Sequence, residues 1–362
     1  MPIYDLSFFE GTFTNIRSGY FMEKFDIVIT WVDNNDPVWR AEKNKYSGEE
    51  NKDDRDRRYR DWKLLKYWFR GIEKFAPWVD HIFFVTYGHL PAFLNTEHPK
   101  LRIVNHRDFI PGKYLPTFSS RTIELNLHRI PGLSENFVYF NDDMFLLKPT
   151  KDTDFFKKGL PRDIAILHAD YIKGEDDDGN PISPEYYYAT LIYNIVLINR
   201  HFNKKKTMLK HLSKWFNPKY GMKVFHNFLL FPIKKFSGLR SQHVPYSLKK
   251  STFEEVWDKE ESVLDKSCSH KFREPIDVSS RLFSYWQVAK GEFSPRSYKS
   301  GYIYAIRNNE EDNRKVYAEI ANRKYQMICL NDHYSGDDFE GVKKRLQQAF
   351  EKVFPEKSSY EK

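Results

Sequence analysis

The chain has 362 residues, of which 40% are apolar and 17% aromatic, so it can build a substantial core in one large or two modest domains. Its mean hydropathy is −0.69. Its longest apolar stretch, residues 186–198, is interrupted and falls short of the roughly 20 residues that cross a bilayer. Residues 1–10 contain Asp5 and Glu10 and lack the apolar region of a signal peptide. We therefore expect a cytoplasmic protein.

Charge and cysteine content further restrict the class of protein and the kind of partner that the sequence allows. Two cysteines, Cys268 and Cys329, cannot form a disulfide framework, and neither lies in a CxxC pair typical of structural zinc. The net charge of +8 fits an anionic partner, which could be a nucleotide-sugar, an anionic glycan, a membrane surface or nucleic acid. An ordinary lysine-rich surface would explain the charge equally well.

Strand and helix patterns alternate through the first 149 residues. Residues 1–24 form an N-terminal arm, residues 25–32 (FDIVITWV) a buried strand, and residues 40–60 a charged loop or helix entrance. An amphipathic helix is predicted at 61–75, and strands at 81–86, 101–105 and 136–140. Ser119 or Ser120 can cap a helix that runs to about Arg129.

This alternation predicts an α/β fold whose core has a Rossmann-like, nucleotide-binding shape. Ligands of such sheets bind at the carboxyl ends of the strands. Asp33 and the Asp142-Asp143 pair both follow predicted strands directly, so they are candidates for the binding site.

The second half of the chain divides less clearly. Residues 150–240 are predicted to be a mostly helical insertion, which could bind an acceptor substrate. This insertion contains an acidic turn at 175–178, an apolar helix at 185–198 and lysines at 204–206. Residues 25–149 and 241–340 together would form the catalytic core. Residues 341–362 carry an amphipathic helix and a tail, and docking of the helix on the core is favoured over docking on a membrane.

The Asn141-Asp142-Asp143 sequence is the first candidate for chemistry. Mg²⁺ prefers oxygen ligands and binds through one or two carboxylates plus substrate phosphates, so Asp142 and Asp143 are candidate metal ligands, with Asn141 beside them. An ordinary Asn-Asp turn is the alternative. Asp33 could hold a ribose, a base or a metal-bound water, but turn capping explains it as well.

A second cluster surrounds the predicted helix start at residues 115–121. Backbone N–H groups at a helix start attract anions, and Arg121 beside Ser120 would add a charged contact to phosphate. Glu124 and His128 are four residues apart and would share one helix face. A capped helix with a surface salt pair is the alternative.

Three further candidates come late in the chain. His243 could be a general base, although a lone histidine is more often structural. Arg273, with Asp277 four residues later, could contact a phosphate or form a surface ion pair. Asp332 lies in the LNDH sequence after an apolar run and repeats the strand-then-Asn-Asp pattern of residues 137–142.

Taken in order, these segments resemble the Stealth family of hexose-1-phosphate transferases. This family includes bacterial capsular polysaccharide phosphotransferases and the catalytic part of the animal N-acetylglucosamine-1-phosphotransferase. The likeness is carried by DIVITWVDNNDP at 26–37, by residues 60–149 through YLPTFSSRTIELNLHRIPGLSENFVYFNDDMFLLKP, by QHVPYSLKKSTFEEVW at 242–257, by SHKFR at 269–273 and by ICLNDH at 328–333.

The resemblance implies a fold like that of GT-A glycosyltransferases and a UDP-sugar donor. It implies Mg²⁺ or Mn²⁺ near Asp142 and Asp143, Asp33 in the donor site, and His243, Arg273 and Asp332 as catalytic residues. The acceptor would be an oligo- or polysaccharide, free or lipid-linked, of a bacterial surface polymer. Peripheral association with the inner face of the membrane is compatible with this role, and no nucleic-acid motif is present. A metal-dependent glycosyltransferase that releases UDP is the alternative enzyme.

Overall fold

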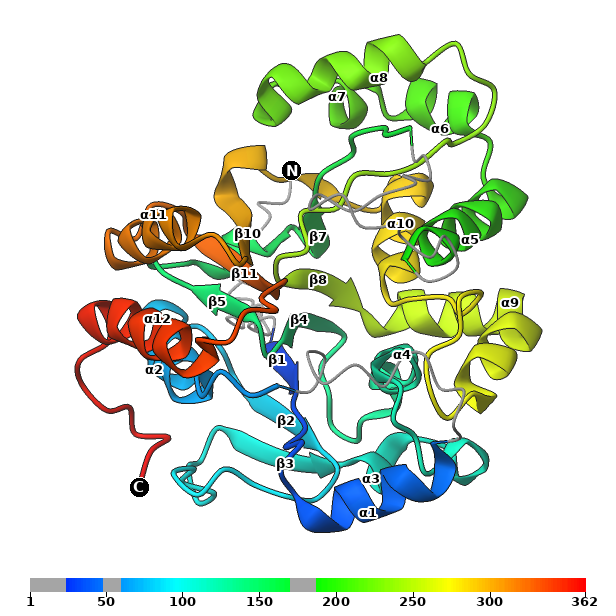
Figure 1. Cartoon of the computed structure of the whole chain (residues 1–362). Coiled ribbons are helices and arrows are strands. Elements are labelled where there is room, and N and C mark those ends of the chain that lie inside the picture. Colours follow the sequence, from blue (N-terminus) through cyan, green and yellow to red (C-terminus); the bar gives the residue numbers. More distant parts are fainter. Residues whose placement is uncertain (1–23, 48–59, 170–186) are drawn as a thin grey trace, which may run out of the picture.

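The computed structural model describes residues 24–47, 60–169 and 187–362 (Figure 1). Its central sheet has five strands in the order β3-β2-β1-β4-β8, and two three-stranded sheets have the orders β10-β11-β5 and β6-β7-β9. The strands are β1 (Phe25–Thr30), β2 (Ile82–Thr86), β3 (Leu101–Asn105), β4 (Asn136–Asn141), β5 (Met144–Leu146), β6 (Phe156–Lys157), β7 (Leu160–Asp163), β8 (Tyr246–Lys249), β9 (Ser294–Pro295), β10 (Gly301–Ile306) and β11 (Met327–Asp332).

The central sheet is parallel except at one edge. β1 pairs in parallel with β2 and β4, β2 pairs in parallel with β3, and β8 joins β4 antiparallel. The sequences of β1 and β2 are almost continuously apolar and buried, as expected for parallel strands covered on both faces. The predicted α/β core with its parallel sheet is therefore confirmed.

Helices cover the sheets. They are α1 (Pro37–Tyr46), α2 (Leu65–Phe75), α3 (His106–Phe109), α4 (Ser120–Leu125), α5 (Tyr187–His201), α6 (Lys204–Lys210), α7 (Leu212–Trp215), α8 (Val224–Leu230), α9 (Lys250–Ser269), α10 (Arg281–Lys290), α11 (Glu310–Ala321) and α12 (Phe339–Val353). In Figure 1, α2 and α12 lie to one side of β1 and β4, and α4 and α9 lie to the other. Short 3-10 turns occupy Gly112–Tyr114, Leu127–Arg129, Asp152–Asp154, Pro218–Lys223 and Tyr298–Ser300.

The C-terminal helix packs on its own chain, as predicted. The apolar face of α12 is buried, and Phe350 stacks on Tyr67 of α2 at a ring-centroid distance of 5.6 Å. The segment after α12 is fixed by Arg70, whose Nε and Nη2 donate to the two carboxylate oxygens of Glu361 at 2.8 and 2.9 Å. Across the residues that the structure describes, no helix has both the length and the apolar character to cross a bilayer.

Several predicted boundaries were wrong. The helix at 61–75 begins only at Leu65, and part of the charged segment at 40–60 belongs to α1, which Asp36 caps by accepting from Trp39 N. The helix expected to reach Arg129 ends at Leu125, and Ser119, its N-cap residue, makes no side-chain cap hydrogen bond. The predicted arm at 1–24, apart from its last residue, and the acidic turn at 175–178 lie outside the described residues.

Candidate functional site

A cavity of about 520 Å³ lies at the carboxyl ends of β1 and β4. Thr30 at the end of β1 pairs with Asn141 at the end of β4. The strand that follows β1 in the chain, β2, lies on the other side of β1 from β4, whereas the strand that follows β4, β5, belongs to another sheet. Such a divergence is where open α/β sheets bind ligands, and the volume suits a small-molecule ligand. Nine of the ten predicted site residues line the cavity: Ser120, Arg121, Glu124, Asn141, Asp142, Asp143, His243, Arg273 and Asp332.

The carboxylate pair occupies the two-residue turn that joins β4 to β5. Tyr139 of β4 fixes the side chain of Asn141, the residue just before this turn, because the Tyr139 hydroxyl donates to Asn141 Oδ1 at 2.5 Å. Desolvation raises the pKa of Asp142 to about 7, and the charges of Asp143 and Asp61 add to this. Desolvation also raises the pKa of Asp143 to about 6. A cation beside this turn would therefore be favoured, chiefly by Asp143, because Asp142 is exposed to solvent.

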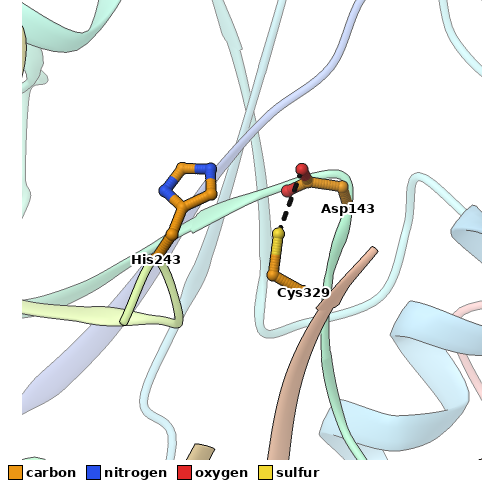
Figure 2. A group of neighbouring side chains, drawn as sticks. All are labelled: Asp143, His243 and Cys329. Carbon is orange, nitrogen blue, oxygen red and sulfur yellow. Dashed lines mark hydrogen bonds between the residues drawn. The ribbon is translucent and has the colours of Figure 1, made fainter. Parts of the chain in front are cut away.

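Figure 2 shows three side chains that the fold brings together beside this turn: Asp143, His243 and Cys329. β5 pairs antiparallel with β11, which places Cys329 opposite Met144 and lets its Sγ donate to Asp143 Oδ2 at 3.3 Å. One ligand atom from each of the three side chains lies within 4.8 Å of the others. Desolvation raises the pKa of the Cys329 thiol well above its usual range, so it stays protonated and acts as a donor.

The donor set at the turn fits a hard divalent cation. Asp142 and Asp143 supply carboxylate oxygens and Asn141 an amide oxygen, which are the ligand types that Mg²⁺ and Mn²⁺ prefer. Asp143 Oδ1 is buried and has no hydrogen-bond partner in the described part of the chain. Because buried carboxylate oxygens are normally satisfied, this atom is available to a cation.

Cationic side chains line the same cavity. Arg273 donates through Nη2 to the hydroxyl of Ser120, and Arg121 donates through Nη1 to the backbone oxygen of Glu274 at 2.5 Å. The loop that carries Arg273 is held against the start of α4, since Phe118 N donates to Lys271 O at 2.8 Å. Arg281, at the start of α10, and Arg60 add two more guanidinium groups to the lining.

His243 lies in the loop before β8, which pairs with β4 and so brings the histidine to the carboxylate turn. Its Nδ1 lies 2.9 Å from the hydroxyl of Tyr246. Desolvation lowers the pKa of His243 to about 3, with smaller contributions from the charges of Arg281 and Arg273. The imidazole is therefore neutral near pH 7 and can accept a proton through a ring nitrogen, although burial makes it a weaker base than a free histidine.

Asp332 lines the cavity but is already engaged. Arg60 Nη2 donates to Oδ1 at 2.6 Å, Arg60 Nε donates to Oδ2 at 3.0 Å, and the indole nitrogen of Trp62 donates to Oδ2 at 3.1 Å. Tyr334 N donates to Oδ1 at 3.0 Å. Because both of its oxygens accept from these donors, Asp332 anchors Arg60 at the cavity wall.

Asp33 is not among the residues that line the cavity, and its Oδ1 accepts from Asn35 N at 2.8 Å, as the turn-capping alternative expects. Its place in the donor site stays a prediction. One interpretation of the sequence was wrong. Glu124 and His128 do not form a surface pair on one helix, because α4 ends between them. Both are buried, and Glu124 accepts instead from the hydroxyl of Ser280.

Sequence reasoning missed four lining or neighbouring groups: Arg60, Asp61, Arg281 and Cys329. One signal could have found Arg281. The Ser-Ser-Arg sequence at 119–121 recurs at 279–281, and both copies lie where a helix begins at the cavity. Cys329 lies within the ICLNDH segment but has no charge or pairing partner in the sequence that would distinguish it.

Comparison with known proteins gives consistent matches. Models of Stealth protein conserved regions 1, 2 and 4 match residues 23–50, 58–163 and 318–362. The capsular polysaccharide phosphotransferase WcwK of Streptococcus pneumoniae is 41% identical over 94% of this chain and 99% of its own. The receptor polysaccharide phosphotransferase WefC of Streptococcus oralis is 39% identical over 94% of this chain and 100% of its own.

Among solved structures, the galactosyltransferase LgtC in complex with donor and acceptor sugar analogs covers 90% of this chain and 95% of its own. The identity is 10% and the TM-score is 0.34, a level that supports no inference about this chain.

Proposed function

The chain belongs to the Stealth family of polysaccharide phosphotransferases, and from this membership we propose that it transfers a sugar-1-phosphate from a UDP-sugar to a hydroxyl group of a glycan acceptor. The transferred unit would be a hexose-1-phosphate or an N-acetylhexosamine-1-phosphate, and the product a phosphodiester linkage in a surface polysaccharide. UMP would be released. The observation that carries the proposal is a single cavity lined by the Asp142-Asp143 turn and by four arginines.

These groups suit a pyrophosphate substrate. Transfer of a phosphoryl-type group depends mainly on positioning and on stabilisation of charge. Arg273 and Arg121 would bind oxygens of the transferred phosphate, and Arg281 would add positive charge beside them. Asp142 and Asp143, with Asn141, would hold Mg²⁺ or Mn²⁺, which supplies neutralisation of pyrophosphate charge when bound.

His243 is the proposed general base. The acceptor hydroxyl oxygen forms a bond to the β-phosphorus, and the bond from this phosphorus to the bridging oxygen breaks. The hydroxyl proton passes to the neutral imidazole, while the bridging oxygen leaves on UMP. Tyr246 would orient the ring through Nδ1, which leaves Nε2 to accept the proton. Asp332 would act indirectly, by holding Arg60 in position at the cavity wall.

The decisive experiment identifies the released nucleotide. The purified chain is incubated with a panel of UDP-sugars, Mg²⁺ and a glycan acceptor, and the nucleotide is separated by anion-exchange chromatography. We expect UMP together with a phosphodiester signal in ³¹P NMR of the product. Release of UDP with a glycosidic bond would refute the proposal and identify a metal-dependent glycosyltransferase.

A matched pair of arginine variants distinguishes loss of a phosphate contact in the cavity from the general loss of one positive charge. Arg273→Gln should lower turnover by about 100-fold or more, since it removes a charged contact to the transferred phosphate. Arg102→Gln alters an exposed arginine of β3 that does not line the cavity, and its turnover should match that of the parent chain.

A further inference from the structure

The positive charge of the chain is concentrated in one segment. Residues 186–253 contain 13 lysines and arginines and no aspartate or glutamate, whereas the rest of the chain contains 45 basic and 50 acidic residues. The excess of charge therefore lies in the segment that includes α5 to α8, and the remainder is slightly acidic. Such an uneven distribution predicts an anionic partner for this segment.

The same segment exposes large apolar side chains. Six of them lie between α6 and α8: Leu209, Leu212, Met222, Phe225, Phe228 and Leu229. Met222 is 78% exposed and Leu229 is 75% exposed, so these side chains are directed into solvent. Scattered apolar residues are normal on a surface, but a cluster of this size marks an interaction site.

Local contacts show that the exposed residues form one surface. Phe228 contacts Phe225 and Phe216, with ring-centroid distances of 6.3 and 4.5 Å, and Phe216 contacts Phe231 at 6.3 Å. The other face of α8 is fixed to the protein through Asn227, which is fully buried and donates to Ala165 O at 2.7 Å. α8 is thus a rigidly held amphipathic helix whose apolar face has no cover from the described residues.

Lysines border this apolar area. Lys205, Lys206, Lys210, Lys219 and Lys234 are exposed in the same segment. Lys205 Nζ lies 6.0 Å from the ring centroid of Phe231, which places positive charge directly beside the aromatic cluster. In Figure 1, α6, α7 and α8 form the outermost layer at the top of the molecule, away from the central sheet.

We propose that this surface of α6 to α8, formed by its exposed apolar side chains and lysines, docks the protein on an anionic lipid bilayer. Phenylalanine, leucine and methionine side chains enter the boundary between headgroups and acyl chains, while lysines bind lipid phosphates. A second copy of the chain is a poor occupant, because a symmetric contact would bring the acid-free lysine clusters together.

This placement has a geometric consequence, which rests on the proposed function. Thr190 and Leu191 near the start of α5 line the cavity, and α5 leads to Lys204 at the start of α6. With a rise of about 1.5 Å per residue, α5 separates the cavity wall from the docking surface by about 20 Å. A bilayer-bound enzyme would therefore hold its cavity within reach of a glycan attached to a lipid.

Vesicle sedimentation of the full chain tests the docking surface. We expect the protein to sediment with vesicles that contain phosphatidylglycerol and to remain in solution with vesicles of phosphatidylcholine alone. The double variants Phe228→Gln/Leu229→Gln and Lys205→Glu/Lys206→Glu should each lower the partition coefficient by about tenfold or more. Because these side chains are exposed, thermal melts should show that both variants stay folded.

Matched controls alter similar groups elsewhere. Ile103→Gln changes an exposed apolar residue of β3, at the opposite end of the molecule in Figure 1. Lys259→Glu/Lys266→Glu makes the same charge change on exposed positions of α9. Both controls should sediment like the parent chain.

Three results would overturn the proposal: no binding to anionic vesicles, equal losses in the control variants, or dimers in sedimentation velocity that Phe228→Gln/Leu229→Gln abolishes. UMP release from a soluble acceptor reports separately on the proposed function, so failure of docking and failure of catalysis can be distinguished.

Discussion

Replacing Asp143 by asparagine should stabilise the metal-free protein while removing its response to Mg²⁺. The pKa of Asp143 is raised from 3.8 to about 6, chiefly by desolvation, so the folded state disfavours the carboxylate that is present at neutral pH. At about 1.4 kcal/mol per pKa unit, the cost above pH 6 is about 3 kcal/mol. The side chain is partly exposed, and screening by water reduces this to about 1.5–3 kcal/mol.

The expected change in melting temperature follows from chain length. With 362 residues, an unfolding entropy of about 2.1 cal/mol/K per residue converts this energy into a rise of about 2–4 °C. Asparagine keeps an oxygen that can accept from Cys329 Sγ, so the substitution removes charge and changes little in packing. The parent chain, by contrast, should melt at a higher temperature when Mg²⁺ is added, because the cation binds only the folded state.

The difference in stability between Asp143→Asn and the parent chain should depend on pH, because the pKa of Asp143 is higher in the folded state than in the unfolded state. Both the folded and the unfolded carboxyl are protonated well below pH 3.8, so the parent chain and the variant should then differ least. As pH rises from about 4 to 6 the unfolded chain releases its proton first, and the parent chain loses stability relative to the variant. The advantage of Asp143→Asn should therefore be about half as large at pH 5 as at pH 8.

Differential scanning fluorimetry with and without Mg²⁺ measures all three effects. Asp265→Asn is the matched control, because hydrogen bonds from Lys113 and Tyr114 lower the pKa of Asp265. This control should not raise the melting temperature and should keep the Mg²⁺ response. An Asp143→Asn variant that melts no higher than the parent chain at pH 8, and that still responds to Mg²⁺, would refute the reasoning.

Three further outcomes are expected. His243→Gln should lower kcat by about 10²- to 10⁴-fold with little change in the KM for the donor, measured as UMP release, and near-normal turnover would remove the assigned base. Desolvation lowers the pKa of buried His106 and His128 to about 3. Below their unfolded pKa of about 6.5 the unfolded chain takes up protons first, so each of these two histidines should reduce the free energy of unfolding by about 1.4 kcal/mol between pH 7.5 and 5.5. In denaturant unfolding, His106→Leu should therefore lose about 1.4 kcal/mol less than the parent chain over this range, and an equal loss in both chains would contradict the shift. Zn²⁺ should inhibit by binding Asp143, His243 and Cys329 together, and Cys329→Ser should raise the inhibitory concentration at least about tenfold; equal inhibition of both chains would argue against that cluster.

Much of the core could be predicted because its signals are local. Buried parallel strands have almost continuously apolar sequences, and β1, β2, β3 and β4 were all placed within two residues of their ends. Helix boundaries were less accurate because capping depends on contacts that the sequence does not display. Ser119 illustrates this: its hydroxyl is buried without a hydrogen-bond partner in the described structure, although serine is a favoured cap residue.

The roles of site residues depend on partners that are distant in sequence. Asp332 repeats the pattern of the carboxylate turn, yet it is held by Arg60, 272 residues earlier. Cys329 reaches Asp143 only through the antiparallel pairing of β11 with β5. Residue type and local pattern identified which groups could do chemistry, but only the pairing of strands shows which of them remain available for it.

The cavity joins two structural supports, a turn between paired strands and a set of helix starts. Its carboxylates lie on the turn between β4 and β5, where pairing with β1 and β11 on either side leaves little freedom. Three of its four arginines lie at the start of α4, in the loop before α10 and at the start of α10. These segments are linked by the backbone contact from Phe118 to Lys271 and by the hydrogen bond from Ser280 to Glu124. A substrate that bridges both sides would contact the metal site at the turn and the arginines at the helix starts together. Substitutions that loosen the Ser280–Glu124 contact should therefore affect turnover more than metal affinity.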